Sequence, residues 1–225
     1  NLKSQAKYFL ISFLLIMIIS SFSILLFDEY NLSIFIGLFL FFWILLNLIY
    51  ELIKKIMLTG NLKAITQNIG MFMSHFGLAI FILGATMVEN SKTEKEIVVA
   101  LNEKLDIKNY TFQFMNITES EGPNYTAVIG HFKIYDNGEF LTDMYPEKRL
   151  YNSSEMPMTE AGIDPGFSRD LYITMGTLID QDKWSVRIYH KPLIRLIWIG
   201  ALMMVFGGIF SVLSKRKNIN IGYSS

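Results

Sequence analysis

Gly70-Met-Phe-Met-Ser-His-Phe-Gly-Leu-Ala-Ile-Phe-Ile-Leu-Gly84 lies within a longer run, 64–88, that contains no Asp, Glu, Lys or Arg. A helix of that length crosses a bilayer core of ~30 Å. Gly70, Gly77 and Gly84 recur at a spacing that places them on one narrow face, where a second helix can approach closely. His75 lies roughly opposite that face. The stretch therefore predicts a membrane helix that packs on two sides, inside a bundle.

His75 is the one ionisable side chain in this run, and two interpretations of it remain open. In the first, the imidazole hydrogen-bonds to a neighbouring helix and serves packing alone. In the second, it is a ligand, because neutral imidazole is a common axial partner of haem iron. Ionisable groups inside a membrane are costly, and function is the default hypothesis for them. The residue alone does not decide between the two.

Three further apolar blocks predict three more membrane helices and so a four-helix membrane protein. The block at 8–27 is longer than the apolar region of a signal peptide, and no small-residue cleavage site follows it. We expect a cytoplasmic flank at 1–7, helices at 8–27, 31–51 and 64–88, a β domain at 89–191, a fourth helix at 192–214 and a cytoplasmic tail at 215–225.

The distribution of Lys and Arg predicts the orientation of these helices. Basic residues gather near the N-terminus, in the loop after the second helix and at Lys215-Arg216-Lys217, whereas Asp28-Glu29 lies in the loop between the first two helices. By the positive-inside rule both termini are cytoplasmic, and the segment 89–191 is periplasmic or its equivalent in an organelle. This topology puts His75 in the inner half of the membrane.

The segment between the third and fourth helices has the pattern of an antiparallel β domain, either a barrel or a sandwich. Apolar and polar residues alternate along 110–117 and 126–135, and 139–144, 171–175 and 184–189 add further strands. Asp136-Asn-Gly138 predicts a tight turn between two of them. Acidic residues outnumber basic ones in this domain.

The remaining candidate site residues are few. The chain contains no cysteine, which excludes disulfides, thiolate metal sites and thiol chemistry. The acidic and basic loops around 147–149 and 158–170 supply carboxylates but no nucleophile or metal cluster, and so a structural role is favoured over catalysis. His190, at the end of the last strand, is a candidate contact for a cofactor edge. Arg195, near the start of the fourth helix, either reaches the lipid headgroups or contacts a haem propionate.

Five motifs in order carry a resemblance to a known family: Gly122-Pro-Asn-Tyr125, Pro146-Glu-Lys-Arg149, Met158-Thr-Glu-Ala-Gly-Ile-Asp164, Arg169-Asp-Leu-Tyr172 and Lys191-Pro-Leu-Ile-Arg-Leu-Ile-Trp-Ile-Gly200. With Ser74-His75-Phe-Gly77 before them, they resemble the C-terminal part of the CcmF family, haem lyase subunits of cytochrome c-type biogenesis. The resemblance covers 75–216 well, and the first two helices only in general character. The family's tryptophan-rich haem-binding loop and its other haem-ligating histidines have no counterpart here.

The resemblance implies that His75 is an axial ligand of a haem b in the membrane, with its iron as the one metal and a second ligand supplied from outside this chain. It implies part of a cytochrome c haem lyase complex, a chain that is not catalytic by itself, and no assigned catalytic residue. The chain is then a fragment or a natural split subunit.

The implied partners are apocytochrome c, the haem chaperone CcmE, CcmH/CcmI-type subunits and the missing N-terminal portion of the same protein. The implied location is the inner membrane of a bacterium or a mitochondrion. The alternative function is a membrane-anchored adaptor whose β domain docks partners and which holds no cofactor. A third interpretation, half of a transporter with His75 as a proton relay, lacks a second buried charge and a pair of broken helices.

Overall fold

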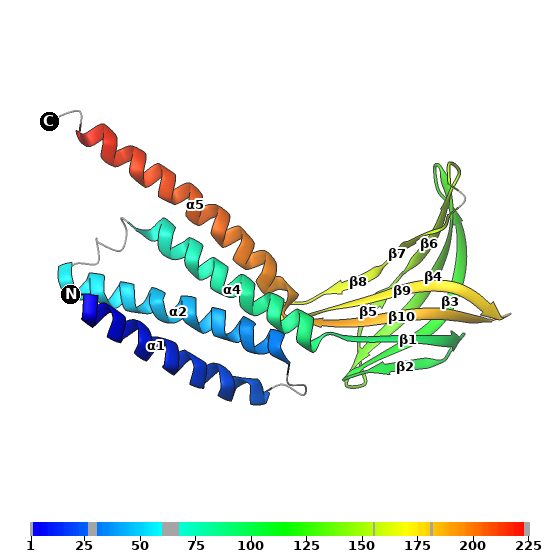
Figure 1. The fold of residues 1–225 in the computed structure, drawn as a ribbon. Coiled ribbons are helices and arrows are strands. Elements are labelled where there is room, and N and C mark those ends of the chain that lie inside the picture. The colour runs from blue at the N-terminus through cyan, green and yellow to red at the C-terminus, as the bar shows by residue number, and fades with distance from the viewer. Residues whose placement is uncertain (1, 27–30, 60–67, 155, 181, 223–225) are drawn as a thin grey trace. The chain divides into compact units, whose positions relative to one another are not determined.

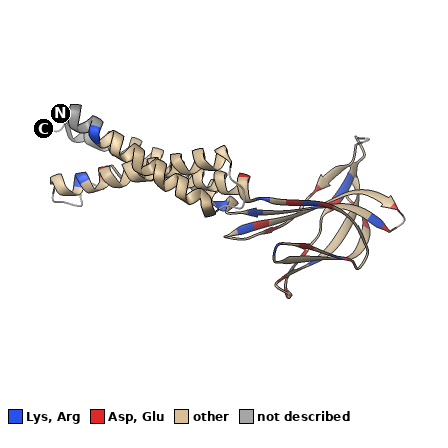
Figure 2. Cartoon of the chain, turned by 60° about the horizontal axis from the view of Figure 1, so that its bottom comes forward, with Lys and Arg blue, Asp and Glu red and all other residues tan. Residues whose placement is uncertain are grey.

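The computed structural model describes residues 2–26, 31–59, 68–154, 156–180 and 182–222 (Figure 1). The chain divides into two compact units. The helical unit comprises Asn1–Ser91 and Leu193–Ser225, and the β unit comprises Lys92–Pro192. Figure 2 shows that charged residues are concentrated on the strands of the β unit and are scarce along the helices.

The helical unit contains α1 (Leu2–Ser23), a short 3-10 helix (Ile24–Leu26), α2 (Leu32–Thr59), α4 (Ile69–Ser91) and α5 (Ile194–Gly222). Within the described residues, three segments are long and apolar enough to cross a membrane: Leu32–Leu58, Ile69–Ser91 and Ile194–Ser214. The apolar part of α1, Lys7–Ser23, is shorter. A fourth membrane crossing therefore stays a prediction. The predicted acidic turn at Asp28-Glu29 lies outside the described residues, as do the side chains of Lys215-Arg216-Lys217.

Helix α2 continues to Thr59, well past the predicted end at residue 51. The prediction is wrong because the charged residues Glu51, Lys54 and Lys55 do not form a loop. These charged residues instead form an exposed part of the same helix, where Lys54 pairs with Glu51 at 3.7 Å one turn earlier. The change from apolar to charged residues does not end the helix.

Helix α4 packs against α5 through its glycines, as predicted. A Cβ atom added at Gly77 would stand 2.7 Å from the carbonyl oxygen of Gly200, and one at Gly84 would stand 2.8 Å from the backbone nitrogen of Ile197. At Gly207, an added Cβ would stand 2.6 Å from the backbone nitrogen of Ser74. These backbones approach so closely because no side chain separates them.

The opposite side of α4 faces α2. Thr86 is buried against Gly37, where any Cβ would overlap the threonine side chain. Near the same helix ends, the Asn31 amide donates to Oδ1 of Asn90 at 2.7 Å, and Asn31 Oδ1 accepts the Ile34 backbone N–H at 2.9 Å, which caps α2. Helix α4 thus lies between two partners, in agreement with the prediction from its two-sided pattern.

The β unit is an antiparallel sandwich, the second of the two predicted architectures. One sheet has the strand order β1-β10-β9-β8, and the other has the order β2-β3-β4-β6-β7, with β5 also paired to β4. The strands are β1 (Thr93–Ala100), β2 (Lys104–Ile107), β3 (Tyr110–Glu121), β4 (Tyr125–Asp136), β5 (Glu139–Met144), β6 (Glu147–Tyr151), β7 (Met158–Glu160), β8 (Gly162–Pro165), β9 (Arg169–Asp180) and β10 (Lys183–Pro192).

The predicted turn at Asp136-Asn-Gly138 is confirmed. Asn137 and Gly138 have φ values of 48° and 88°, and Asp136 pairs with Glu139 across the turn. Positive φ at both central residues is the geometry that an Asn-Gly pair favours in a two-residue hairpin loop. Strand β4 then changes partner along its length, because residues 125–129 pair with β6 and residues 132–136 pair with β5.

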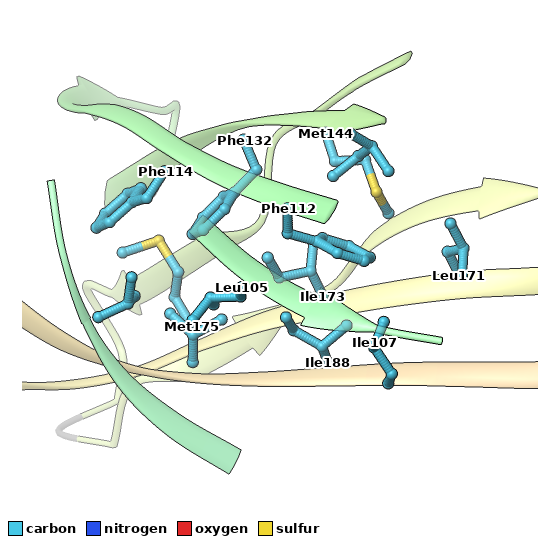
Figure 3. Close-up of a cluster of buried hydrophobic side chains, with 13 residues drawn as sticks. Leu105, Ile107, Phe112, Phe114, Phe132, Met144, Leu171, Ile173, Met175 and Ile188 are labelled. Atoms are coloured by element: carbon cyan, nitrogen blue, oxygen red, sulfur yellow. The ribbon is translucent and has the colours of Figure 1, made fainter. Parts of the chain in front are cut away.

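The core of the sandwich is built from alternate residues of both sheets (Figure 3). Phe114 and Phe132 stack with their ring centroids 4.5 Å apart. Ile173 and Ile188 are fully or almost fully buried opposite them, from β9 and β10. This burial of large apolar side chains provides the main stabilisation of the β unit.

Candidate functional site

His75 lies on the exposed side of α4, and one of its ring nitrogens is held by the helix itself. Nδ1 is 2.8 Å from the carbonyl oxygen of Met71, one turn earlier. A carbonyl oxygen accepts hydrogen bonds and cannot donate them, so Nδ1 carries the proton. In neutral imidazole the other nitrogen, Nε2, then has a free lone pair. This arrangement leaves Nε2 as the atom able to bind a metal.

The imidazole borders a groove of about 280 Å³ between α2 and α4. The groove is lined by Trp43, Ile44, Asn47, Leu48, Glu51, Met71 and His75. Apolar side chains form most of this surface, and Asn47 and Glu51 add the polar groups. The amide of Asn47 donates to the Trp43 carbonyl oxygen at 2.8 Å, which leaves its own Oδ1 as a possible acceptor toward a ligand.

Aromatic rings from α1 fix the position of Trp43 in this groove. Phe9 and Phe13 contact the Trp43 ring edge-on, with centroid distances of 5.2 and 6.1 Å. Phe39, one turn earlier in α2, stacks on it at 5.8 Å. Edge-to-face and offset contacts of this kind are favourable and orient the ring. The Trp43 ring that borders the groove is therefore oriented by aromatic neighbours on α1 and α2.

The groove is partly open and is not an enclosed pocket. Its volume is just below the ~300–1,000 Å³ typical of pockets that enclose a drug-sized ligand, and His75 itself is exposed. The other two histidines, His131 and His190, belong to strands of the β unit. Among the described residues, no group of three or more His, Cys, Asp or Glu side chains is placed to hold a metal ion.

A second groove, of about 460 Å³, also lies in the helical unit. It is lined only by apolar side chains of α2, α4 and α5, among them Leu45, Phe72, Phe76 and Met203. Such a surface supplies no proton-transfer group, and it suits packing against another apolar surface.

His190 and Arg195, the two other predicted contact residues, lie in different settings. His190 follows the inward alternation of Val186 and Ile188 on β10, and it is only 8% exposed. Its Nδ1 has no hydrogen-bond partner among the described residues. Burial, and then the charges of Lys108 and Arg169, lower the pKa of His190 below its usual value. Arg195 is exposed on the first turn of α5. Neither residue lines the groove at His75.

The charged motifs of the β unit are paired with one another. Arg149 binds Glu147 at 2.7 Å and Glu160 at 3.6 Å, and its guanidinium lies over the Tyr125 ring, 4.7 Å from the centroid. Lys148 donates to the Gly176 carbonyl oxygen at 2.8 Å. These side chains are thus engaged within the sandwich, and the arrangement favours a structural role over the binding of an acidic partner.

Sequence reasoning missed the contribution of α2 to the groove. Trp43, Asn47 and Glu51 are spaced four residues apart and so lie along one helix face. Asn47, a polar residue within an apolar segment, is the one sequence signal that could have drawn attention to this face. Which face of α2 meets α4 depends on packing, and the sequence pattern of α2 does not contain that information.

These features define a class: a membrane protein with an antiparallel β-sandwich inserted between two helices, and with a histidine-bearing groove in its helical unit. Comparison with known proteins narrows this class. The family model described as "CcmF C-terminal beta-sandwich" matches residues 90–192.

Relatives from bacteria extend the match beyond the sandwich. The chain is 34% identical over 199 residues to the cytochrome c-type biogenesis protein CcmF of Pseudomonas fluorescens, covering 87% of this chain and 30% of that protein. It is 35% identical over 181 residues to CcmF of Escherichia coli (strain K12), covering 80% of this chain and 28% of that protein. The chain therefore belongs to the CcmF family of cytochrome c-type biogenesis proteins and corresponds to its C-terminal part.

A solved structure shares the fold. The protein titled "Cytochrome c Heme Lyase CcmF" superposes with a TM-score of 0.73 at 17% identity, covering 90% of this chain and 34% of that one. At this identity the likeness concerns the fold. The chain spans about a third of the length of the relatives it matches.

Proposed function

We propose that this chain is the C-terminal portion of a haem lyase subunit and that it holds a haem b within the membrane through Nε2 of His75. The single observation that carries the proposal is the hydrogen bond from His75 Nδ1 to the Met71 carbonyl oxygen. In metal-binding histidines the N–H of the second ring nitrogen commonly donates a hydrogen bond to a carbonyl or carboxylate oxygen, which fixes the ring and raises the basicity of the ligating nitrogen. His75 has that arrangement built into its own helix.

The residues around His75 fit a haem. Trp43, Ile44 and Leu48 give an apolar wall against which a flat macrocycle could lie, and they would limit the access of water to a bound haem. A haem b bound there would supply one-electron transfer. A second ligand of the haem would come from the N-terminal portion of the protein.

We further propose the orientation and partners of the chain. The Lys and Arg distribution favours cytoplasmic termini and a periplasmic β unit. Membership in a cytochrome c-type biogenesis family supports a role in delivering haem to apocytochrome c, together with CcmE and CcmH/CcmI-type subunits. In this arrangement the chain contributes a haem ligand and the β-sandwich, and the remainder of the complex contributes the catalytic residues.

Cytochrome c formation in cells tests this function. The chain is produced together with the N-terminal portion, as wild type, His75→Ala and His131→Ala. His131 lies in the β unit, where it pairs with Asp143 at 2.6 Å, and serves as the matched histidine control. We expect His75→Ala to abolish holocytochrome c and His131→Ala to retain it. Normal holocytochrome c with His75→Ala would favour the adaptor without a cofactor.

A further inference from the structure

The turn between β8 and β9 presents an exposed aromatic side chain on a well-fixed loop. The Gly166 N–H donates to the Arg169 carbonyl oxygen at 2.9 Å, which closes a hairpin loop with Phe167 and Ser168 at its tip. Phe167 is 76% exposed, and Ile163 on the adjacent strand is 50% exposed. Two large apolar side chains thus point away from the core at one end of the β unit.

Side chains of the two neighbouring sequence motifs hold this turn in place. The carboxylate of Asp170, which is only 8% exposed, accepts the Gly166 N–H at 3.1 Å. Arg169 forms an ion pair with Asp164 and donates from Nε to the Tyr110 hydroxyl at 3.0 Å, which links the turn to the other sheet. The charged residues of the turn are therefore occupied internally, and Phe167 is the group presented outward.

Chain connectivity fixes which end of the β unit carries this turn. Arg169 pairs with Pro192, and Thr93 pairs with His190. One residue, Lys92, separates β1 from the end of α4, and one residue, Leu193, separates β10 from the start of α5. A single residue spans at most ~3.3–3.6 Å. The end of the sheet that carries Phe167 is therefore the end at which the chain enters and leaves two candidate membrane helices.

We propose that the β8–β9 turn inserts Phe167 into the interfacial layer of the membrane and that its binding partner is the lipid bilayer. Exposed Phe and Leu side chains of membrane-surface segments bury in the boundary between the lipid headgroups and the acyl chains. A cation also lies at this end of the sheet, where Lys191 pairs with Asp170. The Lys191 ammonium lies 4.6 Å from the Tyr172 ring centroid, and a cation beside an aromatic ring is suited to the lipid headgroup region. The proposal is independent of haem binding and rests on α4 and α5 crossing the membrane.

The absence of cysteine from the chain allows a clean test. In a Phe167→Cys variant, an environment-sensitive fluorophore is attached to the introduced thiol. The labelled chain is reconstituted in nanodiscs of equal parts phosphatidylcholine and phosphatidylglycerol. The matched control is Met156→Cys, since Met156 is also 76% exposed. Its turn is tied to the β3–β4 hairpin by the Asn152 N–H, which donates to the Asn124 carbonyl oxygen at 2.9 Å.

The control site lies far from Phe167. Strand β3 has twelve residues, with Tyr110 at the end that contacts Arg169 and Glu121 at the end near the control turn. At ~3.3 Å per residue the two ends are roughly 35 Å apart. A probe at residue 156 therefore reports on the β unit away from the proposed contact.

We expect a lipid-borne spin label to quench the probe at residue 167 several-fold more than the probe at residue 156, with the opposite order for aqueous iodide. Equal quenching of both probes by iodide would place the turn in water and overturn the proposal. Protection of the probe at residue 167 from both quenchers would also overturn it, because protein rather than lipid would then cover the turn.

Discussion

Nδ1 of His75 lies 2.8 Å from the carbonyl oxygen of Met71 within the same helix. This contact determines the tautomer, because only a protonated Nδ1 can donate to the carbonyl. In the metal-free chain we expect ¹⁵N NMR to show His75 with Nδ1 protonated and Nε2 bare. The signals are assigned by their loss in His75→Ala. A His75 ring protonated mainly at Nε2 would contradict the coordination geometry that we propose.

The contact between α4 and α5 predicts a difference between two glycines. At Gly77 an added Cβ would stand 2.7 Å from the Gly200 carbonyl oxygen, whereas at Gly208 it would meet nothing within 4 Å. We expect Gly77→Ala to lower the free energy of unfolding by ~1–3 kcal/mol through overpacking. Gly208→Ala should be neutral or stabilising by up to ~1 kcal/mol, because alanine is the better helix former.

Unfolding of both variants in detergent micelles, followed by circular dichroism, measures this difference. If Gly77→Ala were as stable as Gly208→Ala, the close packing of these two helices would be refuted.

The buried His190 predicts a pH dependence of the β unit. Burial and two nearby cations lower the pKa of His190 in the folded state, whereas in the unfolded chain it is ~6.5. Just below pH ~6.5, His190 is therefore protonated in the unfolded chain but stays neutral in the folded chain. The free energy of unfolding should fall as the pH drops from ~6.5 to the lowered pKa, and this loss should be absent above ~6.5.

Fluorescence of Trp184 measures this effect during urea unfolding, in a background where Trp43 and Trp198 are replaced by Phe. Trp184 packs against the core of the sandwich and so reports on the β unit. His190→Gln keeps a polar side chain without titration, and we expect it to remove this part of the pH dependence. The same acid sensitivity in wild type and His190→Gln would show that other groups cause it.

The sequence predicted those elements whose pattern is local. The apolar run around His75 and the glycines at 70, 77 and 84 were sufficient to predict a helix with two packing faces. Alternation along β3 and β4 predicted the central strands, and the Asn137-Gly138 pair predicted the tight turn between β4 and β5. In each case, neighbouring residues of one element carry the whole signal.

The elements that were missed depend on distant partners. Strand β6 (Glu147–Tyr151) is rich in charge, and β7 (Met158–Glu160) has only three residues, all exposed. Strand β6 forms by pairing with the edge of β4, and β7 forms by pairing with the edge of β6. Neither strand shows an alternation of apolar and polar residues in the sequence. The same limit applies to the site, because His75 was visible as an ionisable residue in an apolar run, whereas Trp43 joins it only through the packing of α2 on α4.

The reduced absorption spectrum of the membrane protein tests the central claim most directly. The chain is purified together with its N-terminal portion as wild type, His75→Ala and His131→Ala, and the b-type haem band is recorded for each. We predict that the band is present in the wild type and in His131→Ala and is lost in His75→Ala. A full b-type band in His75→Ala, at wild-type protein levels, would contradict the assignment of His75 as a haem ligand.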